Sequence, residues 1–156
     1  MSELKVLKTN ALKAWRGAND KGKALLENLY GEEIFQNQDV RDRIKSFEDA
    51  RIETGRPDVP DFSSLPDSLK KRFQALYKMD VIIEALNEGW EPNWGDTTER
   101  KWRPWFYMSP FRFYDSGFGL VRAYAGGGSR LYLKSKELSD YCADQFLDIW
   151  KDIQVV

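Results

Sequence analysis

The sequence contains no histidine. Histidine is the most frequent general base in enzymes and the most frequent ligand of transition metals in proteins. Its absence excludes a Ser-His-Asp triad and a zinc site. We therefore expect no metal and no cofactor.

Cysteine and long apolar runs are also scarce. The single cysteine, Cys142, excludes an internal disulfide, which suits a reducing compartment. No stretch approaches the roughly 20 apolar residues of a membrane span, and MSELKVLKTN lacks the apolar core of a signal peptide. These absences predict a cytoplasmic protein that does not associate with membranes.

Motifs that would fix a reaction are missing as well. The glycines of YAGGGSRL are consecutive and join two strand-like runs, so they predict a hairpin turn at 126–129 rather than a phosphate loop. An acidic row on the last predicted helix is typical of a solvated face, although carboxylates on successive turns could also bind a hard cation. Cys142 falls on an apolar helix face, where its thiolate is disfavoured. We expect a protein that is not an enzyme. The acidic row consists of Asp140, Asp144, Asp148 and Asp152.

What is present predicts one α+β domain over residues 1–156, with a helical part at 1–89 and a sheet plus helix at 90–156. Apolar periodicity predicts a helix over 10–30 that can break near Asn19, and a short helix from Asp39 to Gly55. A third helix begins at Pro66, with Ser64 as its cap, and ends before Gly89. Its predicted inward residues are Leu69, Phe73, Leu76, Ile82 or Ile83, and Leu86.

After Gly89 the pattern changes to β-favouring runs. They predict a small, mainly antiparallel sheet from about 103 to 134, including a strand at 118–125 and a strand in SRLYLK. Ser135 then caps a last helix that runs to about Ile153 and packs on the sheet.

The stretch KWRPWFYMSPFRFY, residues 101–114, holds seven aromatic and three basic residues and no acidic one. From Lys101 to Lys136 there are seven basic residues against one acid, Asp115. Aromatic faces that stack bases, beside cations that bind phosphates, are typical of surfaces for single-stranded nucleic acid. Aromatic residues are equally typical of a sheet packed on helices, so the stretch is either core or a working surface. Trp90 and Trp94 extend it upstream.

Alternation along FRFYD places Phe111 and Phe113 on one face, as core residues, and Arg112 and Tyr114 on the other. We hypothesise that the exposed residues of this region bind single-stranded nucleic acid or, alternatively, a host or phage protein with tryptophans as anchors. The pI of about 5.6 argues against duplex DNA as the partner. The candidate binding residues are Trp102, Arg103, Trp105, Tyr107, Arg112, Tyr114, Arg122 and Arg130.

Several segments resemble a family of small proteins from tailed phages and prophages of gut bacteria. The segments are ALNEGWEPNW, YMSPFRFYDSGFGL, GSRLYLKSKELSDYCADQF and DIWKD, joined by KGKALLENLYG and RDRIKSFEDA near the N-terminus. The resemblance implies a phage accessory protein that works in the host cytoplasm or with the virion. It implies no activity and no site residue.

Overall fold

The computed structural model describes residues 8–36, 39–119 and 129–155 of the chain. By its internal contacts the chain divides into two units, Met1–Arg43 and Ile44–Val156. The change from helical to strand-favouring sequence predicted near residue 89 does not coincide with this boundary. It lies inside the second unit. That the chain folds as one domain stays a prediction.

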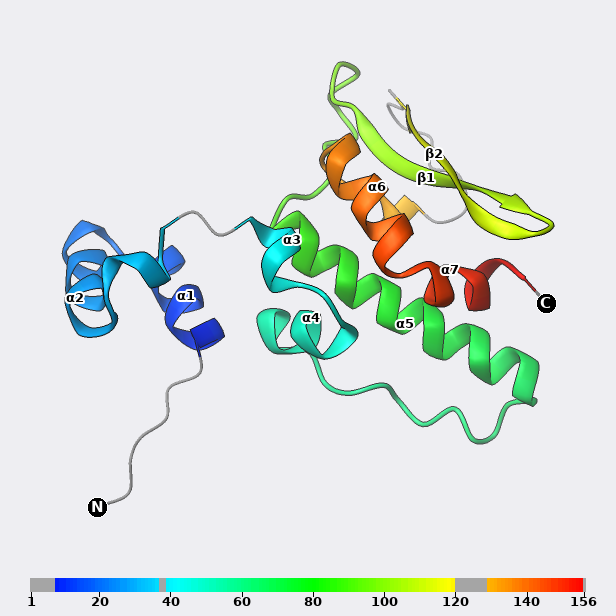
Figure 1. Ribbon diagram of the computed structural model, residues 1–156, viewed down its shortest axis with the longest axis horizontal. Coiled ribbons are helices and arrows are strands. Elements are labelled where there is room, and N and C mark those ends of the chain that lie inside the picture. Colours follow the sequence, from blue (N-terminus) through cyan, green and yellow to red (C-terminus); the bar gives the residue numbers. More distant parts are fainter. Residues whose placement is uncertain (1–7, 37–38, 120–128, 156) are drawn as a thin grey trace. The chain divides into compact units, whose positions relative to one another are not determined.

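The first unit contains two helices that meet at a capped break. Helix α1 spans Lys8–Gly17 and α2 spans Asp20–Tyr30 (Figure 1). The side chain of Asn19 accepts a hydrogen bond of 3.0 Å from the backbone N–H of Gly22, which caps α2. The break predicted near Asn19 is therefore confirmed.

A small aromatic core holds this unit together. Ala11, Leu12 and Phe35 are buried, with Trp15, Leu26 and Ile34 packed against them. Trp15 stacks on Phe35 at 5.8 Å between ring centroids, and its indole N–H donates to Glu27 at 2.8 Å. The unit also contains a 3-10 turn, η1, at Glu32–Ile34 and the short helix α3 at Val40–Arg43.

The second unit begins with α4, Phe47–Thr54. Ser46 caps this helix by accepting from the backbone N–H of Asp49 at 3.1 Å, and Gly55 ends it in a left-handed conformation. The helix predicted from Asp39 to Gly55 is thus two helices, α3 and α4, because Ser46 starts a new one.

The long helix α5 spans Asp67–Asn87 and ends at Glu88 and Gly89, which both have positive φ. The predicted start and end are confirmed, but the cap is Pro66 and no side chain of Ser64 serves it. The inward direction predicted for Leu69 and Phe73 is wrong, since both are more than 40% exposed. The buried residues of α5 begin only at Ala75.

The chain then forms a hairpin of β1, Lys101–Met108, and β2, Phe111–Gly119, the two-stranded antiparallel sheet of the described residues. SRLYLK is not a strand as predicted. It forms a 3-10 turn, η2, at Ser129–Leu131 and one β-bridge between Leu133 and Trp102. The predicted glycine turn and most of the strand predicted at 118–125 lie outside the described residues.

The C-terminal region packs under the hairpin. Ser135 caps α6, Lys136–Gln145, by accepting from the backbone N–H of Leu138. The predicted single helix breaks at Phe146, and α7 continues over Leu147–Gln154. Helix α6 lies against both strands and α7 against β2, while α5 packs on the other side of α6 and α7 (Figure 1). The predicted α+β class, with a C-terminal helix on an antiparallel sheet, is confirmed.

Candidate functional site

The two faces of the hairpin are set by its register. Strand pairing runs from Lys101 opposite Gly119 to Met108 opposite Phe111. Between Trp105 and Phe106 the register shifts, because Tyr114 is an extra residue on β2. Such a bulge reverses the alternation along the bulged strand. Phe111 and Phe113 before it therefore share a face with Ser116 and Phe118 after it.

One face of the hairpin packs on the helices. Phe106 stacks on Phe111 at 5.0 Å, meets Phe113 edge to face at 6.2 Å, and contacts Trp150 of α7 at 5.3 Å between centroids. Nearer the open end, the hydroxyl of Ser116 is buried and lies 2.7 Å from that of Ser139 on α6. The prediction that Phe111 and Phe113 face the core is confirmed.

The other face, which we call the outward face, consists of Arg103, Trp105, Tyr107, Arg112 and Tyr114. Trp105 is 52% exposed, Tyr107 43% and Tyr114 61%. The guanidinium of Arg103 lies 4.6 Å from the Trp105 ring centre, and that of Arg112 lies 4.0 Å from the Tyr107 ring centre. Five of the predicted site residues therefore come together on one surface.

A glycine on β2 allows the Trp105 ring to lie across the hairpin. A Cβ atom at Gly117 would stand 2.8 Å from the indole Nε1 of Trp105 and 3.3 Å from its Cδ1. No side chain larger than hydrogen fits at Gly117 while the indole keeps this position. The spacing of Trp105 and Gly117 across the strands thus positions the largest ring of the outward face.

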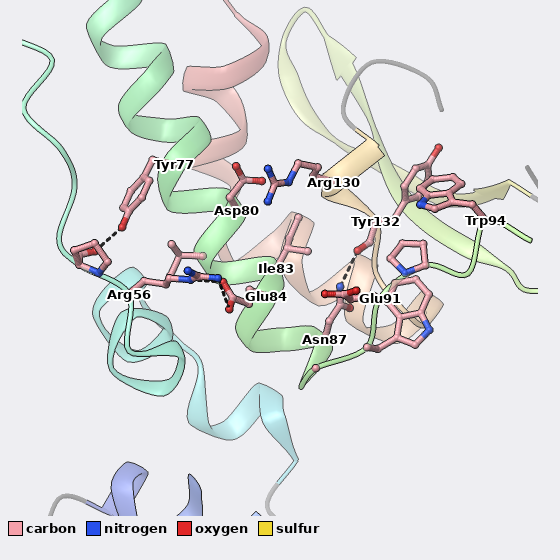
Figure 2. Close-up of a pocket in the computed structure, with 15 residues that line it drawn as sticks. Arg56, Tyr77, Asp80, Ile83, Glu84, Asn87, Glu91, Trp94, Arg130 and Tyr132 are labelled. Carbon is pink, nitrogen blue, oxygen red and sulfur yellow. Dashed lines mark hydrogen bonds and ion pairs between the residues drawn. The ribbon is translucent and has the colours of Figure 1, made fainter. Parts of the chain in front are cut away.

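The remaining predicted site residues lie elsewhere. Trp102 is on the helix-facing side, half-buried, with its ring 4.9 Å from that of Phe118. Arg130 lies on η2, at a pocket beside α5 (Figure 2). Arg122 lies outside the described residues.

Some of the basic residues between Lys101 and Lys136 are paired with carboxylates. Lys101 is fully buried, and its ammonium binds the Glu99 carboxylate at 3.0 Å while lying 5.5 Å from the Trp94 ring centre. Lys136 pairs with Asp115 and with Asp140 of its own helix. The hydrogen bond from Lys136 lowers the pKa of Asp115. Arg103 and Arg112, by contrast, pair with no carboxylate among the described residues.

Glu99 organises the loop between α5 and β1. Besides Lys101, its carboxylate accepts the backbone N–H of Asn93 at 2.7 Å and the indole N–H of Trp90 at 3.3 Å. Burial by itself raises the pKa of Glu99, but the bond from Lys101 and those from Asn93 and Trp90 outweigh it, so the pKa is lowered. The carboxylate thereby fixes the part of the chain that carries Trp90 and Trp94.

This loop forms one wall of a pocket of about 700 Å³ (Figure 2). The opposite wall is α5, and Arg130 and Tyr132 close it on the side of the hairpin. Asp80 and Arg130 point toward one another across the pocket, whereas Arg56 is bound to Glu84 at 2.9 Å. The residues that line it with charged or aromatic side chains are Arg56, Tyr77, Asp80, Glu84, Trp90, Glu91, Trp94, Arg130 and Tyr132.

The pocket and the outward face are connected through one side chain. The Arg103 guanidinium lies 4.6 Å from the Trp105 ring centre and 6.0 Å from that of Tyr132, which lines the pocket. Tyr132 in turn meets Trp94 edge to face at 6.0 Å. Aromatic and guanidinium groups therefore continue from the hairpin into the pocket.

The amino-acid pattern does not predict the α5 wall of this pocket. Asp80 sits within an apolar run, DVIIEAL, that reads as a core helix with scattered surface charges. The signal that could have found it is Gly89, with φ of 86°, because a helix that ends in a left-handed turn brings the following Trp90 back beside its last turns.

Other chemical groups of the described residues offer little. Burial raises the pKa of Cys142 to about 12, against the opposing effect of the Trp150 indole N–H, so its thiol stays protonated. Among the residues that the structure describes, His, Cys, Asp and Glu form no cluster that could hold a metal ion. Within the same residues, no helix has both the length and the apolar character needed to span a membrane.

Comparison of the chain with protein-family models, with curated proteins and with solved structures finds no match.

Proposed function

We propose that the chain is a non-enzymatic binding protein whose outward face binds single-stranded nucleic acid. One observation carries the proposal: three exposed rings and two arginines without carboxylate partners share one face of the hairpin. Exposed rings stack bases of any sequence, and a strand presents them at intervals of about 6.8 Å for alternate residues.

The arginines suit the phosphates of such a strand. A guanidinium that lies flat on a ring keeps its N–H groups at its edge, where they can bind phosphate oxygens. Asp115, the one acid close to the outward face on the hairpin, is paired with Lys136. A phosphate chain that follows Arg103 and Arg112 therefore meets little repulsion from the hairpin itself.

The resemblance to phage and prophage proteins indicates where in the cell such binding would take place. Such a protein would work in the host cytoplasm or with the virion, where single-stranded intermediates of phage nucleic acid occur.

The test is fluorescence anisotropy with labelled oligo(dT) of about 12 nucleotides, a length within the usual site sizes. Trp105→Ala, Tyr107→Ala and Tyr114→Ala should each weaken binding by about 5- to 150-fold, because each removes a stacking platform worth about 1–3 kcal/mol. Phe73→Ala is the matched control, since Phe73 is an exposed ring on α5 away from the hairpin. Equal losses for the control and the hairpin variants would sink the proposal.

A protein partner is the second candidate, because Met108 at the hairpin turn adds an apolar side chain that is 54% exposed. The salt dependence separates the two. If Arg103 and Arg112 each neutralise one phosphate, raising salt from about 50 to about 200 mM should weaken oligo(dT) binding about 7-fold. An interface anchored by aromatic residues should change much less.

A further inference from the structure

The pocket beside α5 is lined by both polar groups and aromatic side chains. Arg56 and Glu84 bind each other, the Tyr77 hydroxyl donates to the Pro57 carbonyl, and the Asn87 amide donates to the Tyr132 carbonyl. These groups form the frame of the pocket. Their main hydrogen bonds are made to one another or to the backbone.

Three charged side chains are not committed in this way. Within the described residues, Asp80, Glu91 and Arg130 make no side-chain hydrogen bond. Asp80 on α5 and Arg130 on η2 face each other without an ion-pair contact, and Glu91 lies on the loop that forms another wall of the pocket (Figure 2). The pocket therefore offers two carboxylates as acceptors and one guanidinium as a donor.

This composition selects against several ligands. A phosphate or carboxylate ligand would meet the negative charge of Asp80 and Glu91. A purely apolar ligand would bury these charges without hydrogen bonds, which is costly. A neutral planar ring with donors on one edge and acceptors on another satisfies the carboxylates, the guanidinium and the indole faces together.

Guanine is the base with this arrangement. Its N1–H and its 2-amino group are adjacent donors that fit the two oxygens of one carboxylate, and its O6 and N7 are the usual bidentate target of arginine. Thymine has no amino group, and its two carbonyl oxygens would face a carboxylate unfavourably. We propose that the pocket binds a guanine base, with Asp80 accepting from its amino edge and Arg130 donating to its O6 and N7.

The position of the pocket indicates which guanine it takes. Arg103 lies against both Trp105 of the outward face and Tyr132 of the pocket. A strand stacked on the hairpin can thus place its next base in the pocket while its phosphates stay on the arginine side. This second step rests on the proposed function of the hairpin.

The experiment compares three oligonucleotides by fluorescence anisotropy. They are oligo(dT), the same strand with one guanine at its 5′ end, and the same strand with one guanine at its 3′ end. Wild-type protein should bind one of the guanine-bearing strands about 5- to 100-fold more tightly, the discrimination that one bidentate contact gives. Hypoxanthine in place of that guanine, which lacks the 2-amino group, should lose most of the gain. Asp80→Asn and Arg130→Ala should abolish the preference and keep the oligo(dT) affinity.

Asp148→Asn is the matched control, because Asp148 is an exposed acid on α7 and not in the pocket. A preference for guanine that survives both Asp80→Asn and Arg130→Ala would overturn the inference, as would equal affinity for all strands. Loss of oligo(dT) binding in Trp105→Ala concerns only the hairpin. If oligo(dT) does not bind at all, the proposed function fails and the pocket is judged by titration with guanosine, which carries no phosphate. Saturable binding that Asp80→Asn removes supports the guanine pocket, and its absence overturns it.

Discussion

At the scale of single residues, Glu99 makes several structural contacts although no pattern in the sequence marks it. It neutralises the fully buried Lys101 and holds the backbone of Asn93 and the indole of Trp90. Removal of one partner of a buried ion pair leaves the other charge uncompensated. In this protein the carboxylate therefore stabilises the second unit and shapes the pocket at the same time.

Glu99→Gln should lower the free energy of unfolding by about 2–3 kcal/mol, less than for a completely buried pair because Glu99 retains some exposure. Urea denaturation followed by tryptophan fluorescence measures this change. Glu91→Gln is a suitable control, since Glu91 is an exposed acid of the same loop. A variant as stable as wild type would show that Lys101 is satisfied by the carbonyls of Asp96 and Glu99 alone.

The same carboxylate gives the stability a pH dependence. Its pKa is lowered in the folded state, so its contribution is complete above the unfolded-state value of about 4.3 and is lost as pH falls through the folded value. Wild-type protein should thus lose stability on acidification below about pH 4.5, and Glu99→Gln should lose less over that range. Parallel pH profiles of the two proteins would contradict this role of Glu99.

At the scale of elements, the hairpin shows how much of a strand's orientation can be predicted from sequence alone. Alternation identified Phe111 and Phe113 as core and Arg112 with Tyr114 as surface, because Phe111, Arg112 and Phe113 precede the bulge and Tyr114 is the bulged residue itself. The choice of Trp102 as a binding residue does not rest on alternation, and Trp102 lies on the helix-facing side, where it pairs with Leu133 and contacts the Phe118 ring. A bulge depends on pairing between two strands, which residues 101–108 alone do not encode.

Helix α5 and the pocket show a related limit. Periodicity predicts the helix and its end at Gly89. Whether Leu69 and Phe73 face inward depends instead on how far along α5 its neighbouring elements extend. Burial begins at Ala75, and in the first two turns the Phe73 ring lies 6.0 Å from that of Phe62 in the preceding loop. The pocket needs residues from α5, the following loop and η2, and their approach is a property of tertiary packing.

Gly117→Ala tests the hairpin as an element. The new methyl group would stand 2.8 Å from the indole nitrogen of Trp105, so the ring must move from its place across β2. We expect oligo(dT) affinity to fall by about 5-fold or more, because stacking requires the ring to be correctly placed. Gly95→Ala, in the loop before β1, is the control. Unchanged affinity with a shifted Trp105 resonance in NMR would show that the ring position is unimportant for binding.

At the scale of the whole molecule, the two units have separate cores. The first is built on Leu12 and Phe35, and the second on residues such as Met79, Leu86 and Cys142. All residues of the outward face and of the pocket belong to the second unit. The proposed binding functions therefore need no residue of Met1–Arg43.

Amide hydrogen exchange on the intact chain shows whether the units unfold together. Met79→Ala should cost about 2–5 kcal/mol, since Met79 is fully buried between α5 and α6, and Leu12→Ala should cost a similar amount in its own unit. If the cores are independent, Leu12→Ala reduces protection only within 8–36 and 39–43, and Met79→Ala only within 44–119 and 129–155. If the chain folds as one domain, as its length predicts, each variant lowers protection in both units equally. Leu12→Ala also tests whether the first unit takes part in binding. If the cores are independent, this variant leaves oligo(dT) affinity unchanged.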